Sequence, residues 1–187
     1  MRVLPTDLEG VYIIEPAVFG DHRGFFMETH NQRRYRDSNI DRTFVQDNIS
    51  YSSRNTLRGL HYQLPQSQAK LVQVITGEIY DVAVDIRKGS PTFGKWVGVL
   101  LSEENHRQIL VSEGFAHGFC VLSETAHVLY KCTDFYSPEN EKGVLWSDPD
   151  LSIDWPIREP VLSAKDEKYP CLSEIPSEHL FKFESQS

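Results

Sequence analysis

Residues 70–87 read KLVQVITGEIYDVAVDIR, two runs rich in β-branched residues on either side of Gly77 and Glu78. A glycine-containing pair between two such runs is typical of a β-hairpin. In the second run apolar and polar residues alternate, with Tyr80, Val82, Val84 and Ile86 on one face and Asp81, Asp85 and Arg87 on the other. The segment therefore predicts a hairpin with one buried face.

The rest of the chain repeats this pattern of short strands between turn signals. We expect further strands at residues 24–29, 44–50, 57–63, 95–101, 107–111, 115–122 and 126–136. Helices are expected only at 31–37 and 174–181. After Trp146, five prolines exclude long regular elements. The pattern predicts an all-β sandwich or barrel with a few short helices, formed by residues 1–187 as a single domain, around which a C-terminal tail wraps.

Composition limits the classes of function. The chain has 187 residues, 40% of them hydrophobic and 25% charged, as in ordinary globular domains. Its 27 acidic and 19 basic residues give a net charge of −8, which disfavours nucleic acid and anionic membranes as partners but permits one small anionic ligand. The longest uncharged run, 59–69, has 11 residues and is too short to cross a bilayer, and the N-terminus lacks a secretory signal. We therefore expect a cytoplasmic protein.

Several common kinds of site have no signature in the sequence. Cys120, Cys132 and Cys171 include no CxxC pair, so neither a disulfide framework nor a cysteine zinc site is expected. The glycines do not form a dinucleotide-binding or P-loop pattern, and no nucleophile elbow is present.

Three strand segments carry residues suited to acid–base chemistry. Arg58 and His61 flank a glycine within a strand, His117 shares a face with phenylalanines, and Tyr130 and Tyr136 share one face if their strand has no bulge. Taken singly, each motif is more simply explained by packing than by function, as a hydrogen-bonded core histidine or a buried tyrosine pair. The two tyrosines also suit a proton donor and a stacking ring.

Taken together, seven short motifs occur in one order. They are Asp21-x-Arg23-Gly24-x-Phe26-x-Glu28, Gln46-Asp47-Asn48, residues 57–63, residues 89–94, residues 114–119, Asp148-Pro149 and Trp155-Pro156. On these motifs the chain resembles the dTDP-4-dehydrorhamnose 3,5-epimerase family of the cupin superfamily, from about residue 10 to residue 166. The resemblance implies a cupin-type double-stranded β-helix, that is, a jelly-roll barrel.

The resemblance also implies a cupin barrel that lacks the usual metal-binding site. Metal-binding cupins have a His-x-His pair and a following glutamate, whereas this chain has His61-Tyr62-Gln63 and then Lys70. A lysine ammonium has no lone pair to offer a metal ion. Of the usual histidines His61 and His117 remain, so we expect neither a metal nor another cofactor.

The family's reaction removes and returns protons beside a ketone. Its substrate is a dTDP-linked 4-keto-6-deoxyhexose, whose C3 and C5 protons are acidified by the C4 carbonyl, and inversion needs no redox cofactor. By resemblance His61 is the base, Asp166 holds its tautomer and Tyr130 is the proton donor. Lys70 matches a position where it stabilises charge developing on O4.

The remaining matched positions bind substrate. By resemblance Arg23 and Arg58 contact the diphosphate and Tyr136 stacks on thymine. Other ligand-contacting positions match Glu28, Gln46, Asp47, Asn48, His117, Glu141 and Lys165. The resemblance further implies a homodimer in which a strand of one subunit contributes to its partner's site. A regular strand would place Arg58 and His61 on opposite faces, so either Gly59 breaks the alternation or Arg58 serves the neighbouring subunit.

The sequence is also compatible with other functions. An epimerase that inverts only C3 or only C5 of a related sugar would share the same residues. A metal-dependent cupin oxygenase is disfavoured by Gln63 and Lys70. A sugar-binding cupin without activity would not need His61, Asp166, Tyr130 and Lys70 together.

Overall fold

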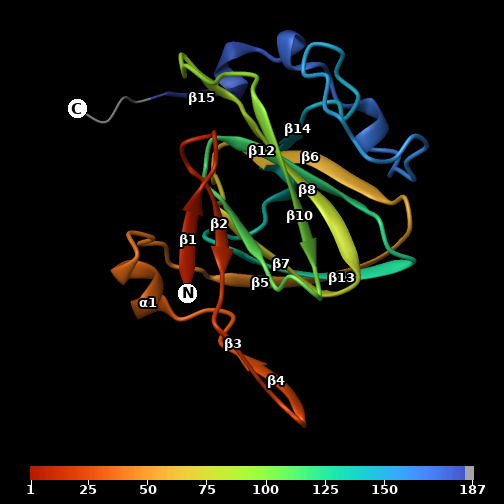
Figure 1. Cartoon of the computed structure of the whole chain (residues 1–187). Coiled ribbons are helices and arrows are strands. Elements are labelled where there is room, and N and C mark those ends of the chain that lie inside the picture. Colours follow the sequence, from red (N-terminus) through yellow and green to blue (C-terminus); the bar gives the residue numbers. More distant parts are fainter. Residues whose placement is uncertain (184–187) are drawn as a thin grey trace.

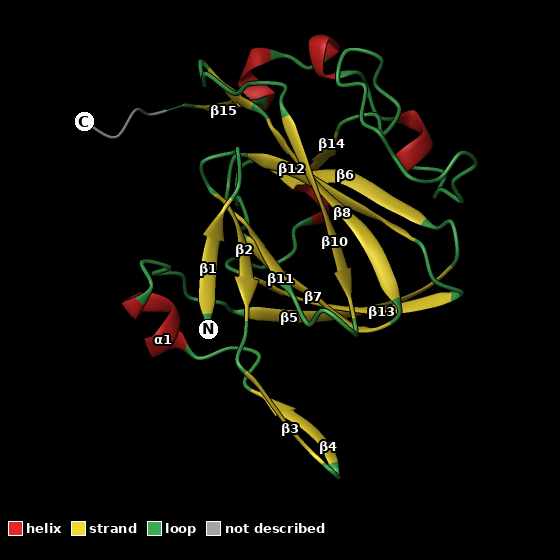
Figure 2. Ribbon diagram, in the orientation of Figure 1, coloured by secondary structure: helices red, strands yellow, loops and turns green. Residues whose placement is uncertain are grey.

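Two facing β-sheets form most of the computed structural model, which describes residues 1–183 (Figures 1 and 2). The six-stranded sheet has the order β1 (Arg2–Pro5), β2 (Val11–Glu15), β11 (Gln108–Val111), β7 (Lys70–Thr76), β13 (Thr125–Cys132) and β5 (Gln46–Ser53). The five-stranded sheet has the order β10 (Trp96–Ser102), β8 (Glu78–Asp85), β12 (Phe115–Val121), β6 (Leu57–Gln63) and β14 (Glu141–Gly143). Neighbouring strands in both sheets are antiparallel. The predicted all-β jelly-roll barrel is confirmed.

The main core lies between the two sheets. It joins Val72, Val74 and Val128 of the six-stranded sheet to Ile79 and Phe119 of the five-stranded sheet, all of them buried. Strands with one face in such a core read as alternating apolar residues, which is why the sequence pattern located most of them. Apolar side chains fill only part of the barrel interior. Toward one end, the interior is lined mainly by polar side chains.

The C-terminal tail covers the outer face of the five-stranded sheet. Leu151, Leu172 and Leu180 of the tail are buried against Leu60 and Val84. The tail contains the 3₁₀ turns η2 (Asp166–Lys168), η3 (Leu172–Glu174) and η4 (Ser177–His179), which follow η1 (Pro138–Asn140). Two hydrogen bonds attach it to this sheet, from Trp96 Nε1 to Leu151 O (3.0 Å) and from the Tyr62 hydroxyl to His179 O (2.9 Å).

The helix predicted at residues 174–181 is wrong. The segment forms the turns η3 and η4, and then β15 (Phe181–Lys182), which pairs in parallel with β9 (Arg87–Lys88). Pro176 lies between the two turns, where it lacks the N–H that a continuous helix needs. The predicted strand at 126–136 also ends early, at Cys132.

The short helix predicted at residues 31–37 is confirmed as α1 (Gln32–Asp37). The side chain of Asn31 caps it by accepting hydrogen bonds from the backbone N–H groups of Arg33 and Arg34. Tyr35 of this helix is buried against Leu71 and Leu110 on the outer face of the six-stranded sheet.

The hairpin predicted at residues 70–87 is wrong, although both of its strands exist. β7 pairs with β11 and β13 in one sheet, whereas β8 pairs with β10 and β12 in the other. Gly77, at φ +83°, carries the chain between the sheets, and a Cβ there would lie 2.2 Å from Thr125 O. The glycine is required for a crossover rather than for a tight turn.

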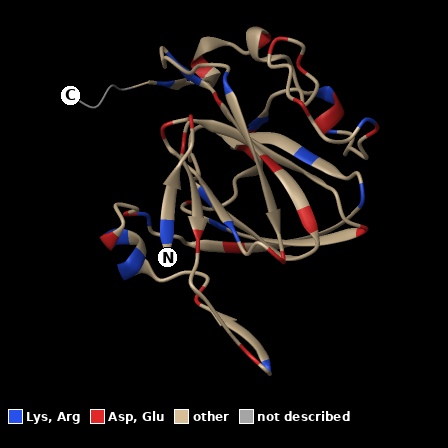
Figure 3. Ribbon diagram, in the orientation of Figure 1, with Lys and Arg blue, Asp and Glu red and all other residues tan. Residues whose placement is uncertain are grey.

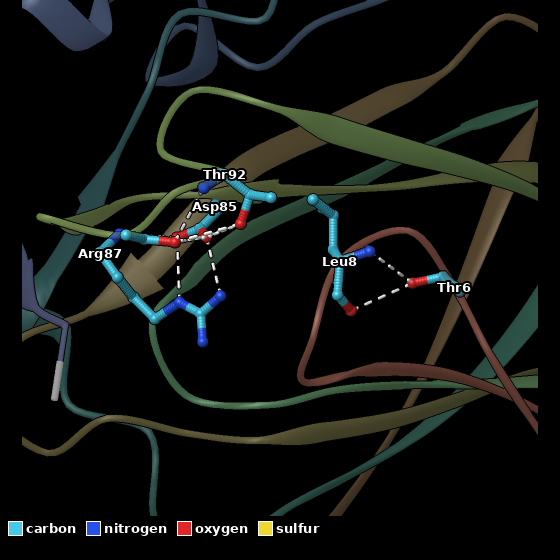
Figure 4. A network of polar contacts seen from close by, with 6 residues as sticks. Thr6, Leu8, Asp85, Arg87 and Thr92 are labelled. Atoms are coloured by element: carbon cyan, nitrogen blue, oxygen red, sulfur yellow. Dashed lines mark hydrogen bonds and ion pairs between the residues drawn. The ribbon is translucent and has the colours of Figure 1, made fainter. Parts of the chain in front are cut away.

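The predicted burial of one face of this segment is confirmed, and the opposite face of β8 is buried as well. Asp81 and Asp85 are both fully buried, because the tail covers one face of β8 and the barrel interior covers the other. Figure 4 shows Arg87 and Thr92 converging on Asp85, which binds the Arg87 guanidinium (2.7 Å) and the Thr92 hydroxyl (2.6 Å). Figure 4 also shows the N-terminal turn in which Leu8 N donates to Thr6 Oγ1 (3.2 Å).

An arm projects from the barrel near the N-terminus. It consists of β3 (Val18–Asp21) and β4 (Gly24–Met27), which pair only with each other (Figure 1). Phe19, Phe25 and Phe26 on this arm are 63%, 59% and 71% exposed. β4 falls within the predicted strand at 24–29, but β1, β2 and β3 were not predicted.

Charges of both signs are interspersed along the ribbon (Figure 3). None of the helices within residues 1–183 is long and apolar enough to cross a membrane.

Candidate active site

A cavity of about 570 Å³ opens between the two sheets at the polar end of the barrel, a volume typical of small-molecule sites. Predicted site residues that line it are Gln46, Asn48, Arg58, His61, Lys70, His117, Tyr130, Tyr136, Glu141, Lys165 and Asp166. The cavity wall therefore unites residues from six strands, the loop after β13 and the C-terminal tail.

His61 and Asp166 form a hydrogen-bonded pair in this cavity. His61 lies on β6, and Asp166 opens the turn η2 of the tail, with 2.6 Å between His61 Nε2 and Asp166 Oδ1. Asp166 is buried, which alone would raise its pKa, but the hydrogen bond from His61 brings the pKa below its ordinary value. The carboxylate thus stays ionised, fixes the ring and favours a proton on Nε2, which leaves Nδ1 as the free nitrogen of a neutral imidazole.

Tyr130 and Lys70 enter the cavity from the opposite sheet. Tyr130 lies on β13, and Lys70 begins the neighbouring strand β7. Burial raises the pKa of Tyr130, so its hydroxyl keeps its proton at neutral pH. Burial lowers the pKa of Lys70, while the nearby carboxylates of Glu141 and Asp81 oppose this shift. One wall of the cavity therefore carries the imidazole of His61, and the opposite wall carries the hydroxyl of Tyr130 and the amine of Lys70.

A second histidine–carboxylate pair lies beside the first. His117 stands opposite His61 in the β12–β6 register, and its Nε2 lies 2.9 Å and 3.0 Å from the two carboxylate oxygens of Asp81. His117 is 8% exposed and Asp81 is fully buried. Because Nε2 of His117 is hydrogen-bonded to Asp81, only Nδ1 is available to a ligand.

Arg58 lines the same cavity as His61, which settles the conflict with strand alternation. Gly59, at φ +135°, breaks the alternation, and the β12–β6 register shifts between His117 and Phe119. A Cβ at Gly59 would lie 2.5 Å from the Cα of Gly118, so the two strands approach closely only because both residues are glycines. Arg58 Nε then donates to Ser52 Oγ (3.0 Å).

Tyr136, Glu141 and Lys165 form a polar group on the same cavity wall. The Tyr136 hydroxyl donates to Glu141 Oε2 (2.8 Å), and Lys165 Nζ lies 2.6 Å from the same oxygen. The hydrogen bond to Glu141 raises the pKa of Tyr136. Tyr136 follows the end of β13, so it reaches the cavity of Tyr130 from a loop and not by strand alternation.

Three predicted site residues do not line this cavity. Asp47 points outward between Gln46 and Asn48 and pairs with Lys131 (2.8 Å). Glu28 lies beside α1, where it accepts a hydrogen bond from Asn31 (3.1 Å). Arg23 stands at the tip of the β3–β4 arm, where it pairs with Asp21 (2.6 Å).

The cavity also contains residues that sequence analysis missed. The lining includes Ser50, Tyr62, Gln63, Gln68, Val72, Phe119, Cys132 and Ser163, and Asp81 lies behind His117. Alternation along the strands from predicted site residues points to five of them, Ser50, Gln63, Val72, Phe119 and Cys132. Tyr62, Gln68 and Ser163 follow from no such alternation.

The residues of a cupin metal site are arranged differently here. Both functional ends of the Gln63 amide are bound to backbone groups, since Ser137 N donates to its Oε1 (2.9 Å) and its Nε2 donates to Gln66 O (2.7 Å). Within residues 1–183 no cluster of three or more His, Cys, Asp or Glu side chains is arranged to hold a metal ion.

Comparison with known proteins adds an independent finding. Residues 5–174 match the family model described as dTDP-4-dehydrorhamnose 3,5-epimerase. A relative with that name from Shigella flexneri is 57% identical over 169 residues, covering 89% of this chain and 93% of its own.

Solved structures agree with this match. The structure of an epimerase from Legionella pneumophila in complex with dTDP-4-keto-L-rhamnose has a TM-score of 0.96 and 52% identity, covering 98% of this chain and 99% of its own. A 3′-monoepimerase from Streptomyces bikiniensis in complex with dTDP-quinovose has a TM-score of 0.86 and 37% identity, covering 91% and 87%.

Proposed function

Because the chain belongs to the dTDP-4-dehydrorhamnose 3,5-epimerase family, we propose that it inverts C3 and C5 of dTDP-4-dehydro-6-deoxy-D-glucose to give dTDP-4-dehydro-L-rhamnose. The enzyme is an isomerase of dTDP-rhamnose biosynthesis. The observation that carries the proposal is the His61–Asp166 pair, which faces Tyr130 and Lys70 across one cavity.

The reaction begins with proton removal. The C3 and C5 protons lie beside the C4 carbonyl, so their loss gives an enolate. His61 takes the proton with its free nitrogen, and the Asp166 carboxylate stabilises the resulting imidazolium. Lys70, as an ammonium fixed in the cavity wall, stabilises the negative charge that develops on O4, since a preorganised charge needs no reorganisation when that charge appears.

Inversion requires that the proton return from the other side. His61 and Tyr130 belong to different sheets, so a sugar ring lying between them presents one face to each. Tyr130 gives its proton to the carbon, and the enzyme then resets as His61 loses a proton and Tyr130 regains one through solvent. Proton transfers alone balance the reaction, so no redox cofactor is needed.

The other cavity residues bind the nucleotide part of the substrate. Arg58 offers a planar guanidinium to the diphosphate. Tyr136, which is 52% exposed, offers a ring on which thymine stacks. Gln46, Asn48, His117, Glu141 and Lys165 supply further polar contacts.

We also propose a homodimer in which the β3–β4 arm of one subunit completes the cavity of the other. Three exposed phenylalanines on a two-stranded arm leave apolar surface that a second copy of the chain can bury. Arg23 on this arm does not line its own cavity, yet it is suited to the diphosphate. Glu28 and Asp47 likewise do not line the cavity of their own chain, so in this proposal they contact substrate through the same assembly.

An exchange experiment tests the function and separates it from single-centre inversion. The purified enzyme is incubated in deuterium oxide with dTDP-4-keto-6-deoxyglucose, and the product is analysed by NMR. We expect deuterium at both C3 and C5 with inversion of both. Exchange at C3 alone would favour the single-centre reading, which the similarity to a 3′-monoepimerase keeps as the second candidate. No exchange at either carbon would contradict epimerase activity.

A further inference from the structure

The loop that carries Tyr136 is held by three glutamine side chains. Residues 134–137 follow β13 and belong to no strand. Gln68 Nε2 donates to Asp134 O (2.7 Å), and Gln46 Oε1 accepts from Tyr136 N (2.9 Å). We call Gln46, Gln63 and Gln68 the glutamine cradle, because Gln63 binds the two remaining residues of this loop.

Gln63 occupies the centre of the cradle. Its Nε2 donates to Phe135 O (3.2 Å), and its Oε1 accepts from Ser137 N (2.9 Å), so one amide bridges the residues on either side of Tyr136. The second Nε2 hydrogen is bound by Gln66 O (2.7 Å). With both donor hydrogens in use and only 4% of the residue exposed, Gln63 has no donor left for a ligand.

We propose that Gln63 is a positioning residue for nucleotide binding, which fixes the Tyr136 loop so that its ring is ready to stack on the thymine base. This inference rests on the proposed function, in which Tyr136 is the stacking residue. The position that holds a metal ligand in other cupins thus serves here to shape the nucleotide site.

Preorganisation is the physical reason for such a cradle. A half-exposed ring on an unpaired loop would lose conformational freedom on binding, and that loss would weaken affinity. Here the cradle fixes the backbone of Tyr136, and Glu141 fixes its hydroxyl (2.8 Å). Since neither contact involves the reacting carbons, the cradle affects binding of the nucleotide and not proton transfer.

The test compares three single variants for dTDP affinity by calorimetry and for turnover at saturating substrate. Gln63→Ala removes the bridge, and Gln63→Glu keeps an acceptor for Ser137 N but loses both donors. Gln73→Ala is the matched control, since Gln73 is also 4% exposed and bonds to Gln108, away from the loop. We expect both Gln63 variants to bind dTDP about tenfold more weakly with kcat nearly unchanged, whereas Gln73→Ala lowers the melting temperature without changing affinity.

A double variant separates this inference from the proposed function. If Gln63 acts through Tyr136, Gln63→Ala in a Tyr136→Ala background costs little further affinity. Full affinity in Gln63→Ala, with Tyr136→Ala weakened, would overturn the role of Gln63 alone. Full affinity in Tyr136→Ala would instead overturn the stacking assignment. Equal additional losses in both backgrounds would also contradict a role through Tyr136.

Discussion

His61 Nε2 lies 2.6 Å from Oδ1 of Asp166, a residue 105 positions further along the chain. The histidine belongs to a barrel strand, whereas the carboxylate arrives on a tail that is packed against the outside of the same sheet. The orientation of the proposed base therefore depends on the docking of the tail.

Asp166→Asn is expected to leave the base in place but remove its support. The amide cannot stabilise the imidazolium, and either of its ends can face His61, so the tautomer is no longer fixed. We expect kcat to fall by about 10²-fold, less than in a variant without the base. Steady-state kinetics check this, and the contradicting outcome is an unchanged kcat in a folded protein.

Asp81 is expected to raise the pKa of Lys70, in addition to its hydrogen bond with His117. Its negative charge opposes the lowering of the Lys70 pKa by burial, so Asp81→Asn lowers that pKa further. If Lys70 acts as the ammonium, the alkaline limb of kcat/KM moves to lower pH in this variant. The pH profile of kcat/KM measures the shift, with Gln73→Ala as a folded control. A limb that stays in place would show that Asp81 does not act on Lys70.

The ion pair of Asp85 with Arg87 gives a prediction for stability against pH. Burial alone would raise the pKa of Asp85, but hydrogen bonds from Arg87, Ser90 and Thr92 bring it below its ordinary value. Because the folded pKa lies below the unfolded one, the pair stabilises the fold fully above about pH 4 and loses this effect as pH falls through the folded pKa.

Asp85→Asn should therefore lower the free energy of unfolding by about 3 kcal/mol at pH 7, since it leaves a half-buried guanidinium without its counterion. Urea unfolding at pH 7 and near pH 3 tests this, and the difference between wild type and variant should narrow at the lower pH. A difference that is the same at both values would refute the linkage.

Mixed dimers test whether the arm acts in trans. Arg23→Ala and His61→Ala are expected to be weakly active or inactive alone. After subunit exchange in an equal mixture, half of the dimers combine one of each, and each of these has one intact site if Arg23 serves the partner. Activity should then recover to about a quarter of wild type.

The control mixture combines His61→Ala with Asp166→Asn, whose changes fall within a single chain's cavity. This mixture contains no intact site under either arrangement. Recovery in neither mixture would place Arg23 in its own subunit's site or outside the site altogether.

Most of the barrel could be predicted because its strands are short, alternate in polarity and pack against one core. β6 was predicted with its observed bounds, and α1 was predicted within one residue. The hairpin at 70–87 failed because a local pattern marks strands and a glycine between them, whereas sheet membership depends on distant partners such as β13. The arm carries exposed phenylalanines, so its first strand, β3, lacks the alternation of a buried strand.

The order of the motifs along the sequence predicted which residues form the site. How these residues are arranged in space is known only from the structure. The resemblance named His61, Tyr130 and Asp166, but only the structure shows that a tail turn brings Asp166 to His61. Asp81 and Gln63 were not named as site residues, because their importance lies in bonds to His117 and to the Tyr136 loop.

The division of labour between His61 and Tyr130 is the central claim, and deuterium exchange into the substrate tests it most directly. His61→Asn removes the base at similar size, so both exchange and inversion should stop. Tyr130→Phe keeps the ring but lacks the hydroxyl, so His61 should still exchange protons on one face while inversion falls by about 10²-fold or more. Full exchange and inversion in His61→Asn would contradict the mechanism, and equal losses of both in Tyr130→Phe would contradict the assignment of the two residues to opposite faces.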